Sequence, residues 1–133
     1  MAVASPSIVG FVGVSKKTMR VRGAPAIGVA ASFAAALGAL KLGELAPANF
    51  QTKFFAICDE INQARPTARN LSWALERMKR RFALVRDLPP RKRTAALITE
   101  AKRIYSEDIE INRRIGKNGA RLIARHDNIL THC

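Results

Sequence analysis

The sequence predicts a mainly α fold, an antiparallel bundle of four helices between residues 25 and 124. Three observations support this prediction. Apolar residues recur at alternating spacings of three and four, which is the period of one helix face. Prolines stand where these apolar stripes begin and end. Only two short stretches, residues 8–14 and 128–133, resemble strands.

The composition is that of one globular domain. A chain of 133 residues, 48% apolar and 25% charged, is long enough for a single hydrophobic core. It is too rich in apolar residues for a disordered chain. The two cysteines, Cys58 and Cys133, are too few for a disulfide scaffold, so we expect a protein of the reducing cytoplasm.

The first helix is expected from Pro25 to about residue 41, with Gly43 as its C-terminal stop. Residues 24–40 carry no charge, but they are mostly alanine and glycine and fall short of the ~20 strongly apolar residues of a membrane span. We therefore expect a tightly packed internal helix and no membrane association. The chain starts without a basic segment before its apolar part, so we expect no signal peptide.

Two further helices follow from the apolar spacing. The second begins near Pro47, with Cys58 beside its stripe as core filler, and ends at Arg65 and Pro66. Thr67 is expected to cap the third helix, which ends before the prolines at 89 and 90. The residues expected in the core are Phe50, Phe54, Ile57 and Ile61 of the second helix and Leu71, Leu75, Met78, Phe82 and Val85 of the third.

The fourth helix is expected over residues 91–124, with Gly116 and Gly119 permitting close helix packing. Residues 128–133 then look like the opening of a buried strand. Such a strand either pairs with residues 8–14 or marks the chain as a fragment, and we favour the fragment. The residues of the fourth helix expected in the core are Leu97, Ala101, Ile104, Ile111, Ile115 and Leu122.

The net charge of +13 indicates an anionic partner, whether nucleic acid, an anionic membrane or a phosphorylated small molecule. Residues 65–103 hold twelve basic and three acidic residues. The only aromatic side chains near the densest run are Trp73 and Phe82, and both fit the apolar stripe or its edge. No nucleic-acid-binding motif is present, so we do not expect nucleic acid as the partner.

Two expected helix starts each carry an arginine. Arg22, Gly23 and Ala24 precede the first helix, and Arg65 precedes the third. The free N–H groups of a first helical turn favour an anion, and arginine adds charge-assisted hydrogen bonds to phosphate. Either arginine alone is as readily a plain surface residue. Together they describe a phosphate clamp, provided that the fold brings the two helix starts together.

Four sequence blocks resemble one family in their order and spacing. Residues 21–28 read VRGAPAIG, residues 65–75 read RPTARNLSWAL, residues 107–116 read EDIEINRRIG, and residues 129–133 read ILTHC. These blocks resemble the S-methyl-5-thioribose-1-phosphate isomerase family, within the superfamily of the initiation factor 2B regulatory subunits. The resemblance covers residues 21–133, whereas residues 1–15 do not match the usual opening of the family.

The resemblance implies a two-domain protein. Residues 1–20 would be a poorly matching segment, residues 21–127 the N-terminal helical-bundle domain, and residues 128–133 the first strand of a Rossmann-like α/β domain that is missing after residue 133. It also implies an aldose–ketose isomerase of methionine salvage, which converts 5-methylthioribose 1-phosphate to 5-methylthioribulose 1-phosphate. We expect this enzyme to be cytoplasmic, homodimeric when full length, and free of cofactor and metal.

The resemblance also implies site residues. Arg22, Gly23, Ala24 and Arg65 would contact the substrate, and Cys133 would be the catalytic cysteine. The aspartate that serves as its acid partner, and an Asn-Lys pair that binds substrate, belong to the following domain. The chain would then hold half a site and be inactive alone.

Several alternatives stay open. A non-catalytic initiation factor 2B-like regulatory protein is one, although the RGAPAIG block and Cys133 argue against it. Isomerases of ribose 1,5-bisphosphate or 5-deoxyribose 1-phosphate are others; Pro25 and Ala26 disfavour only the bisphosphate. The spacing of His126, Asp127 and His132 fits no zinc site.

The acidic block of the fourth helix has a simpler interpretation than acid–base chemistry. Glu107 and Glu110 share a helix face, while Asp108 is turned about 100° away from them. We expect a solvated or interface face there.

Overall fold

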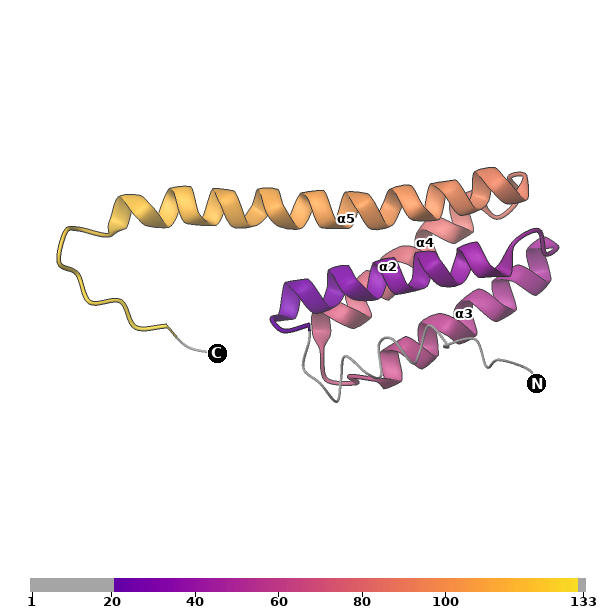
Figure 1. The fold of residues 1–133 in the computed structure, drawn as a ribbon, viewed down its shortest axis with the longest axis horizontal. Helices are drawn as coiled ribbons and strands as arrows, with labels where there is room; N and C mark the ends of the chain where they lie inside the picture. Colours follow the sequence, from indigo (N-terminus) through magenta and orange to yellow (C-terminus); the bar gives the residue numbers. More distant parts are fainter. Residues whose placement is uncertain (1–20, 132–133) are drawn as a thin grey trace, which may run out of the picture.

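The computed structural model describes residues 21–131, and these residues form four α-helices and one short 3-10 helix (Figure 1). The α-helices are α2 (Ala24–Leu42), α3 (Pro47–Gln63), α4 (Arg69–Val85) and α5 (Pro90–Gly119), and the 3-10 helix is η1 (Ala120–Leu122). No strand occurs within residues 21–131. The predicted mainly α fold is confirmed for this part, whereas the strand predicted over residues 8–14 lies outside the described residues.

The helices alternate in direction along the bundle, as the prediction requires (Figure 1). Helix α2 is central, because it packs against α3, α4 and α5. Helix α5 is the longest and extends well beyond the other three, toward the end of the bundle where α2 begins (Figure 1).

Helix α2 is the tightly packed internal helix that the sequence predicts. It ends at Gly43, whose φ of 59° lies in the left-handed region that favours glycine. It buries a stripe of small residues, on which three helices pack closely: Gly28, Ala31, Ser32, Ala34, Ala35, Ala36, Gly38 and Ala39. In the described part of the chain, α2 is the one helix long and apolar enough to span a membrane by length and composition alone.

The core is built around phenylalanines of α3 and α4. The rings of Phe50 and Phe82 stack with their centroids 5.5 Å apart, and Phe54 lies 5.7 Å from Phe82. One assignment on α3 needs correction, because Ile57 is only half-buried, whereas Cys58 is completely buried. Cys58 follows Phe54 by four residues and therefore shares its helix face more closely than Ile57 does.

The residues predicted for the α4 stripe are all buried: Leu71, Leu75, Met78, Phe82 and Val85. Trp73 lies at the edge of that stripe and is half exposed.

Arg93, one of the twelve basic residues counted between residues 65 and 103, is not on the surface. Its side chain is buried, with the guanidinium carbon 4.1 Å from the ring centroid of Phe50. It donates hydrogen bonds to the carbonyl oxygens of Leu45 at 2.7 Å and Arg86 at 3.3 Å. Burial lowers the pKa of Arg93. The residue ties the α2–α3 turn to the residue that follows α4.

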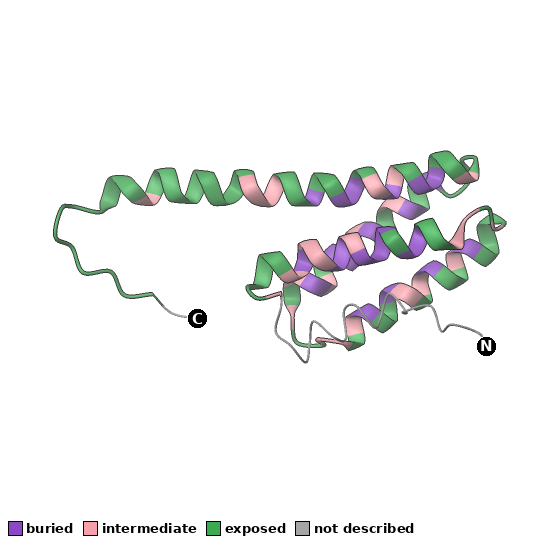
Figure 2. Cartoon of the chain, in the orientation of Figure 1, coloured by how far each residue is buried: buried purple, intermediate pink, exposed green. Residues whose placement is uncertain are grey.

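The two halves of α5 differ in burial, as Figure 2 shows by the change from purple to green along the helix. Leu97, Ala101 and Ile104 are buried as predicted. The prediction was wrong further on, since Ile111 is 45% and Ile115 63% exposed. The same holds for Leu122, which lies in η1 and is 86% exposed.

The end of α5 also differs from the prediction. The helix stops at Gly119 rather than near residue 124, and an added Cβ at Gly116 or Gly119 would meet no described atom within 4 Å. Residues 128–131 have no regular secondary structure, and their assignment to a first strand stays a prediction.

Candidate active site

The first candidate binding element is the N-terminus of α2. Gly23 precedes this helix with a φ of 88°, a conformation that glycine adopts without strain. Its carbonyl oxygen accepts the first intrahelical hydrogen bond, from the N–H of Ile27 at 3.0 Å. The N–H groups of Ala24 and Ala26 therefore have no intrahelical partner, and Pro25 has no N–H. The turn is exposed and presents donors suited to an anion.

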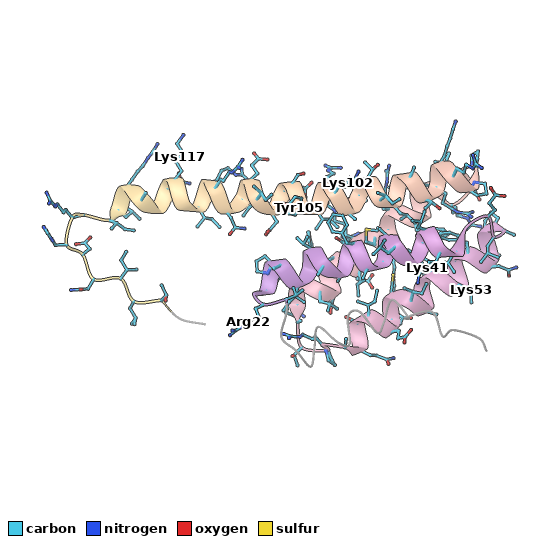
Figure 3. All side chains as sticks on the ribbon, viewed as in Figure 1. Arg22, Lys41, Lys53, Lys102, Tyr105 and Lys117 are labelled. Carbon is cyan, nitrogen blue, oxygen red and sulfur yellow. The ribbon has the colours of Figure 1, made fainter. Side chains whose placement is uncertain are left out.

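Arg22 lies immediately before this turn and is exposed. Figure 3 shows its side chain at the start of α2, directed away from the bundle. The three residues predicted to contact phosphate, Arg22, Gly23 and Ala24, thus form one exposed corner of the molecule.

The second candidate element is the turn before α4, where the structure corrects the sequence prediction. Helix α4 begins at Arg69 rather than at Thr67, and its N-cap is Ala68, so Thr67 does not cap it. Arg65 lies four residues before the helix, half-buried, in the turn between α3 and α4. Its carbonyl oxygen accepts a hydrogen bond from the N–H of Ala68 at 3.0 Å. Arg65 therefore belongs to the tight turn that feeds α4.

The first turns of α2 and α4 lie against each other, whereas a joint phosphate site of Arg22 and Arg65 stays a prediction. Gly28, one turn into α2, faces the backbone of Asn70, the second residue of α4. A Cβ atom added to Gly28 would lie 2.7 Å from the carbonyl oxygen of Asn70, closer than packing allows. Only glycine fits this crossing without a shift of one helix, so Gly28 sets the distance between the two helix starts.

A cleft of about 430 Å³ opens where α2 and α4 begin, and α5 forms its third wall. We call it the α2–α5 cleft. Its walls are mostly apolar, with a few polar groups, as is typical of a small-molecule or partner site. The lining residues are Pro25, Gly28 and Val29 of α2, Asn70 and Trp73 of α4, and Ile104, Glu107, Asp108, Ile111, Asn112 and Ile115 of α5.

Glu107 is held in the cleft wall by two arginines. The guanidinium of Arg77 donates to its carboxylate from both terminal nitrogens, and Arg103 Nε donates to Oε1 at 2.8 Å. The hydrogen bond from Arg77 lowers the pKa of Glu107, and the same bond raises the pKa of Arg77. Arg77 Nε also donates to Glu100 at 2.6 Å. Glu107 is therefore a structural anion, unsuited to donate a proton.

The acidic block is arranged differently from the prediction. Glu107 and Asp108 both line the cleft, whereas Glu110 is exposed. The side-chain amide of Asn112 donates to the backbone oxygen of Asp108 at 2.8 Å and to its carboxylate at 3.2 Å. The interpretation as a solvated or interface face fits Glu110, but Glu107 is engaged in a network.

Cys133, predicted to be the catalytic residue, lies outside the described residues, as does His132. Within residues 21–131 the one cysteine is Cys58, which is fully buried. Burial raises the pKa of its thiol to about 12, so it stays protonated at neutral pH. It is a core residue and no nucleophile. In the described part of the chain, no group of three or more His, Cys, Asp or Glu residues is placed to hold a metal ion.

The sequence did not indicate the structural roles of two residues of this region. Gly28 lies in the interior of a helix, where glycine costs about 1 kcal/mol relative to alanine. A glycine at such an unfavourable position is a sequence signal of a close contact between two helices. Glu107 was considered only with its neighbours on α5, because its partner Arg77 is 30 residues earlier and no sequence pattern links the two.

Comparison with known proteins identifies the family. The profile of the initiation factor 2 subunit family matches residues 20–133. Methylthioribose-1-phosphate isomerase of Syntrophus aciditrophicus is 47% identical, over 88% of this chain and 36% of its own length. Petrotoga mobilis has a relative named 5-deoxyribose 1-phosphate isomerase, 44% identical over 88% of this chain and 34% of its own length. The chain thus spans about a third of the length of these curated relatives.

A solved structure agrees with the fold. The crystal structure of 5-methylthioribose 1-phosphate isomerase from Pyrococcus horikoshii is similar to this chain with a TM-score of 0.79 and 37% sequence identity. The similarity covers 86% of this chain and 32% of that protein. With a matching family profile over nearly its whole length, the chain belongs to the initiation factor 2 subunit family.

Proposed function

We propose that this chain supplies the helical N-terminal part of an aldose–ketose isomerase that converts 5-methylthioribose 1-phosphate to 5-methylthioribulose 1-phosphate. The observation that carries the proposal is the crossing of Gly28 and Asn70, which puts the starts of α2 and α4 at one corner of the bundle. The names of the relatives, at 44–47% identity, support the same chemistry.

In this proposal the α2 corner binds the phosphate. The N–H groups of the first turn offer donors at the positive end of the helix dipole, and Gly23 lets the ligand approach the backbone. Arg22 and Arg65 add charge-assisted hydrogen bonds from two chain segments. A net charge of +13 raises the local concentration of the phosphorylated substrate.

Catalysis in this proposal needs groups beyond the bundle. Phosphate on the anomeric oxygen prevents the spontaneous opening of the sugar ring, so an acid must assist the opening before hydrogen moves between C2 and C1. Cys133 is the proposed catalytic thiol. The acid that partners it, and a dry pocket around both, come from a following Rossmann-like domain whose first strand begins at residues 128–133.

The assembled enzyme is proposed to be a cytoplasmic homodimer that uses no metal or cofactor. The two cysteines fit a reducing compartment.

5-Deoxyribose 1-phosphate is the second candidate substrate. The relative from Petrotoga mobilis that bears this name is nearly as similar to the chain as those named for methylthioribose 1-phosphate. Both sugars carry the same 1-phosphate and differ at C5, so the proposed phosphate corner serves either of them.

A hybrid enzyme tests the proposal. Residues 21–133 replace the matching third of the Syntrophus aciditrophicus relative, and turnover of the two sugar phosphates is compared with that of the parent. We expect methylthioribose 1-phosphate to be turned over faster. Arg65→Ala should lower kcat/KM, with a loss of transition-state stabilisation of about 1.5–3 kcal/mol. Cys133→Ser should abolish turnover.

The controls separate folding from chemistry. Lys53→Ala changes an exposed lysine of α3, away from the start of α2, and should leave kcat/KM within about twofold. The 133-residue chain alone should show no turnover. A folded hybrid inactive on both sugars would refute the isomerase proposal, and unchanged kinetics of Arg65→Ala would remove Arg65 from the site.

A further inference from the structure

An open groove runs between α4 and α5; it shares Trp73 with the α2–α5 cleft but contains none of the residues proposed to bind the phosphate. Its volume is about 410 Å³. The α4 wall consists of Trp73, Arg77, Arg80, Arg81 and Leu84, and the α5 wall of Glu100 and Arg103. We call it the arginine groove.

The α4 wall combines charge in its centre with apolar side chains at its ends. Trp73 and Leu84 are 11 residues apart in one helix, which is about 16 Å at 1.5 Å per residue. Trp73 is 50% and Leu84 79% exposed, although both are large and apolar. Arg80 and Arg81 lie between them. A ligand that covers both ends must be at least 16 Å long, well beyond a single phosphate or carboxylate.

The arginines of the groove are unequally compensated. Arg77 is fully occupied by Glu100 and Glu107, and Arg103 is paired with Glu107.

The other two arginines keep unmet hydrogen-bonding capacity. Arg81 Nε lies 4.0 Å from Glu100 Oε2, and this buried nitrogen has no hydrogen-bond partner among the described residues. Arg80 is exposed and makes no ion pair within the described part of the chain. Arg80 is thus open to an external anion, and Arg81, paired only at 4.0 Å and 37% exposed, is open to one in part. Guanidinium prefers a planar carboxylate or a phosphate.

We infer that the arginine groove docks an acidic, amphipathic segment of a separate protein. Carboxylates of that segment pair with Arg80 and Arg81, and its apolar side chains cover Trp73 and Leu84. The proposal rests on complementarity between two surfaces. The groove is basic in its centre and apolar at both ends, and the partner segment would be acidic in its centre and apolar at both ends.

Nucleic acid fits the groove less well. Trp73 is the one aromatic side chain among the described residues of the groove wall. Arg77 covers one face of its ring, with the guanidinium carbon 5.6 Å from the ring centroid. Leu84 offers a base no π-face for stacking.

A second copy of the chain and the rest of a longer chain also fit less well. Two copies that met groove to groove would set Arg80 and Arg81 of one against the same arginines of the other. Helix α5 continues for 16 residues from Arg103 to Gly119, about 24 Å, before the chain leaves it. A domain that follows Gly119 is therefore closer to the exposed outer half of α5 than to the arginine groove.

Fluorescence anisotropy with a designed probe tests the inference on the 133-residue chain. The probe is a labelled 18-residue peptide with leucines near both ends and glutamates between them, spaced for one helix face. A scrambled peptide of the same composition is the reference. We expect the patterned probe to bind at least about tenfold more tightly than the scrambled one, and less tightly in high salt.

Variants locate the binding surface. Arg80→Glu with Arg81→Glu should weaken binding of the patterned probe by about tenfold or more. The matched control, Arg113→Glu with Arg114→Glu, makes the same charge change on the exposed outer half of α5 and should change binding less than about twofold. Trp73→Ala should weaken binding several-fold. Circular dichroism checks the fold of each variant, and Arg80→Glu alone, at an exposed position, replaces the double variant if that one unfolds.

Four results would overturn the inference. The first is no binding of the patterned probe, and the second is equal binding of the scrambled probe. The third is equal weakening by the two charge-reversal pairs, which would show a diffuse attraction to a +13 chain. The fourth is tighter binding of a 20-nucleotide oligothymidylate with the same dependence on Arg80, which would assign the groove to nucleic acid. None of these results depends on isomerase activity.

Discussion

The two halves of α5 have similar sequence patterns and opposite surroundings. In the first half, Leu97, Ala101 and Ile104 are buried against the bundle. In the second half, Ile111 and Ile115 continue the spacing at intervals of seven and four but are 45% and 63% exposed. The helix itself is continuous from Pro90 to Gly119, so the difference lies in what packs against it.

The contrast shows what an apolar stripe reports. Spacing indicates which face of a helix is prepared for burial, but it does not indicate whether the covering element is present. The curated relatives are about three times as long as this chain, and exposed isoleucines beside the α2–α5 cleft are the surface on which we propose that a further domain packs. The inner half of α5 completes a core, and the outer half leaves its apolar side chains exposed.

The largest expected difference comes from matched truncations in the two halves. Leu97→Ala removes a fully buried side chain and should lower the free energy of unfolding by about 2–5 kcal/mol. Ile115→Ala removes a mostly exposed one and should change it by less than about 0.5 kcal/mol. Urea unfolding followed by circular dichroism measures both. Similar losses in the two variants would mean that the outer half of α5 is covered in solution, for instance by self-association.

Two glycines sharpen the comparison, because the same substitution should have opposite signs. Gly28→Ala pushes a methyl group to 2.7 Å from the carbonyl oxygen of Asn70 and should destabilise the fold by about 1–3 kcal/mol. Gly116→Ala in the outer half meets no described atom within 4 Å and should stabilise the helix by up to about 1 kcal/mol. Thermal unfolding of both variants checks the signs. An unchanged stability of Gly28→Ala would show that α2 and α4 can move apart enough to accept the added methyl group.

Local sequence signals were enough to predict most of the bundle. Prolines at the helix starts, the glycine at residue 43 and the period of the apolar residues predicted four helices and most of their buried faces, because each signal acts within a few residues. The exceptions are long-range. The buried Arg93 donates a hydrogen bond to the carbonyl oxygen of Leu45, which is 48 residues away in sequence. No local pattern therefore distinguishes Arg93 from the exposed Arg91 and Lys92.

The candidate site divides in the same way. The exposed turn at Gly23 could be predicted from the glycine and the proline that follow Arg22 in sequence, since a helix start is a local event. The sequence could not predict the contact between the starts of α2 and α4, because this contact depends on the packing of Gly28 against Asn70, 42 residues later. The role of Cys133 stays a prediction, since it lies outside the described residues.

A smaller effect should appear in alkaline solution, and only from the packed region. Burial raises the pKa of the Cys58 thiol to about 12 in the folded chain, against an ordinary value near 8.5 in the unfolded one. Below pH 8 both states keep the proton and stability is unaffected. As the pH rises above about 9, only the unfolded chain ionises, so the free energy of unfolding should fall by about 1–2 kcal/mol by pH 10. Urea unfolding of Cys58→Ala should lack this slope, and an equal slope in that variant would assign it to other groups.

The smallest expected effect lies at Glu107, on the boundary between the two halves of α5. The hydrogen bond from Arg77 lowers the pKa of Glu107 below its ordinary value near 4.3, so its stabilising effect is fully present above that value. It is lost as the pH falls through the lowered pKa. The side chain is 35% exposed, which limits the effect to below about 1 kcal/mol.

Glu107→Gln should therefore be less stable than the parent at pH 6, with the difference shrinking toward pH 3 in urea unfolding. The control is Glu110→Gln, one turn further out, where the carboxylate is exposed and makes no ion pair among the described residues. It should stay within about 0.5 kcal/mol of the parent at every pH. A Glu107→Gln deficit that is constant from pH 3 to pH 6 would show that Glu107 acts through packing and not through its charge. The ion pair to Arg77 would then not be what stabilises α5 at the point where it leaves the bundle.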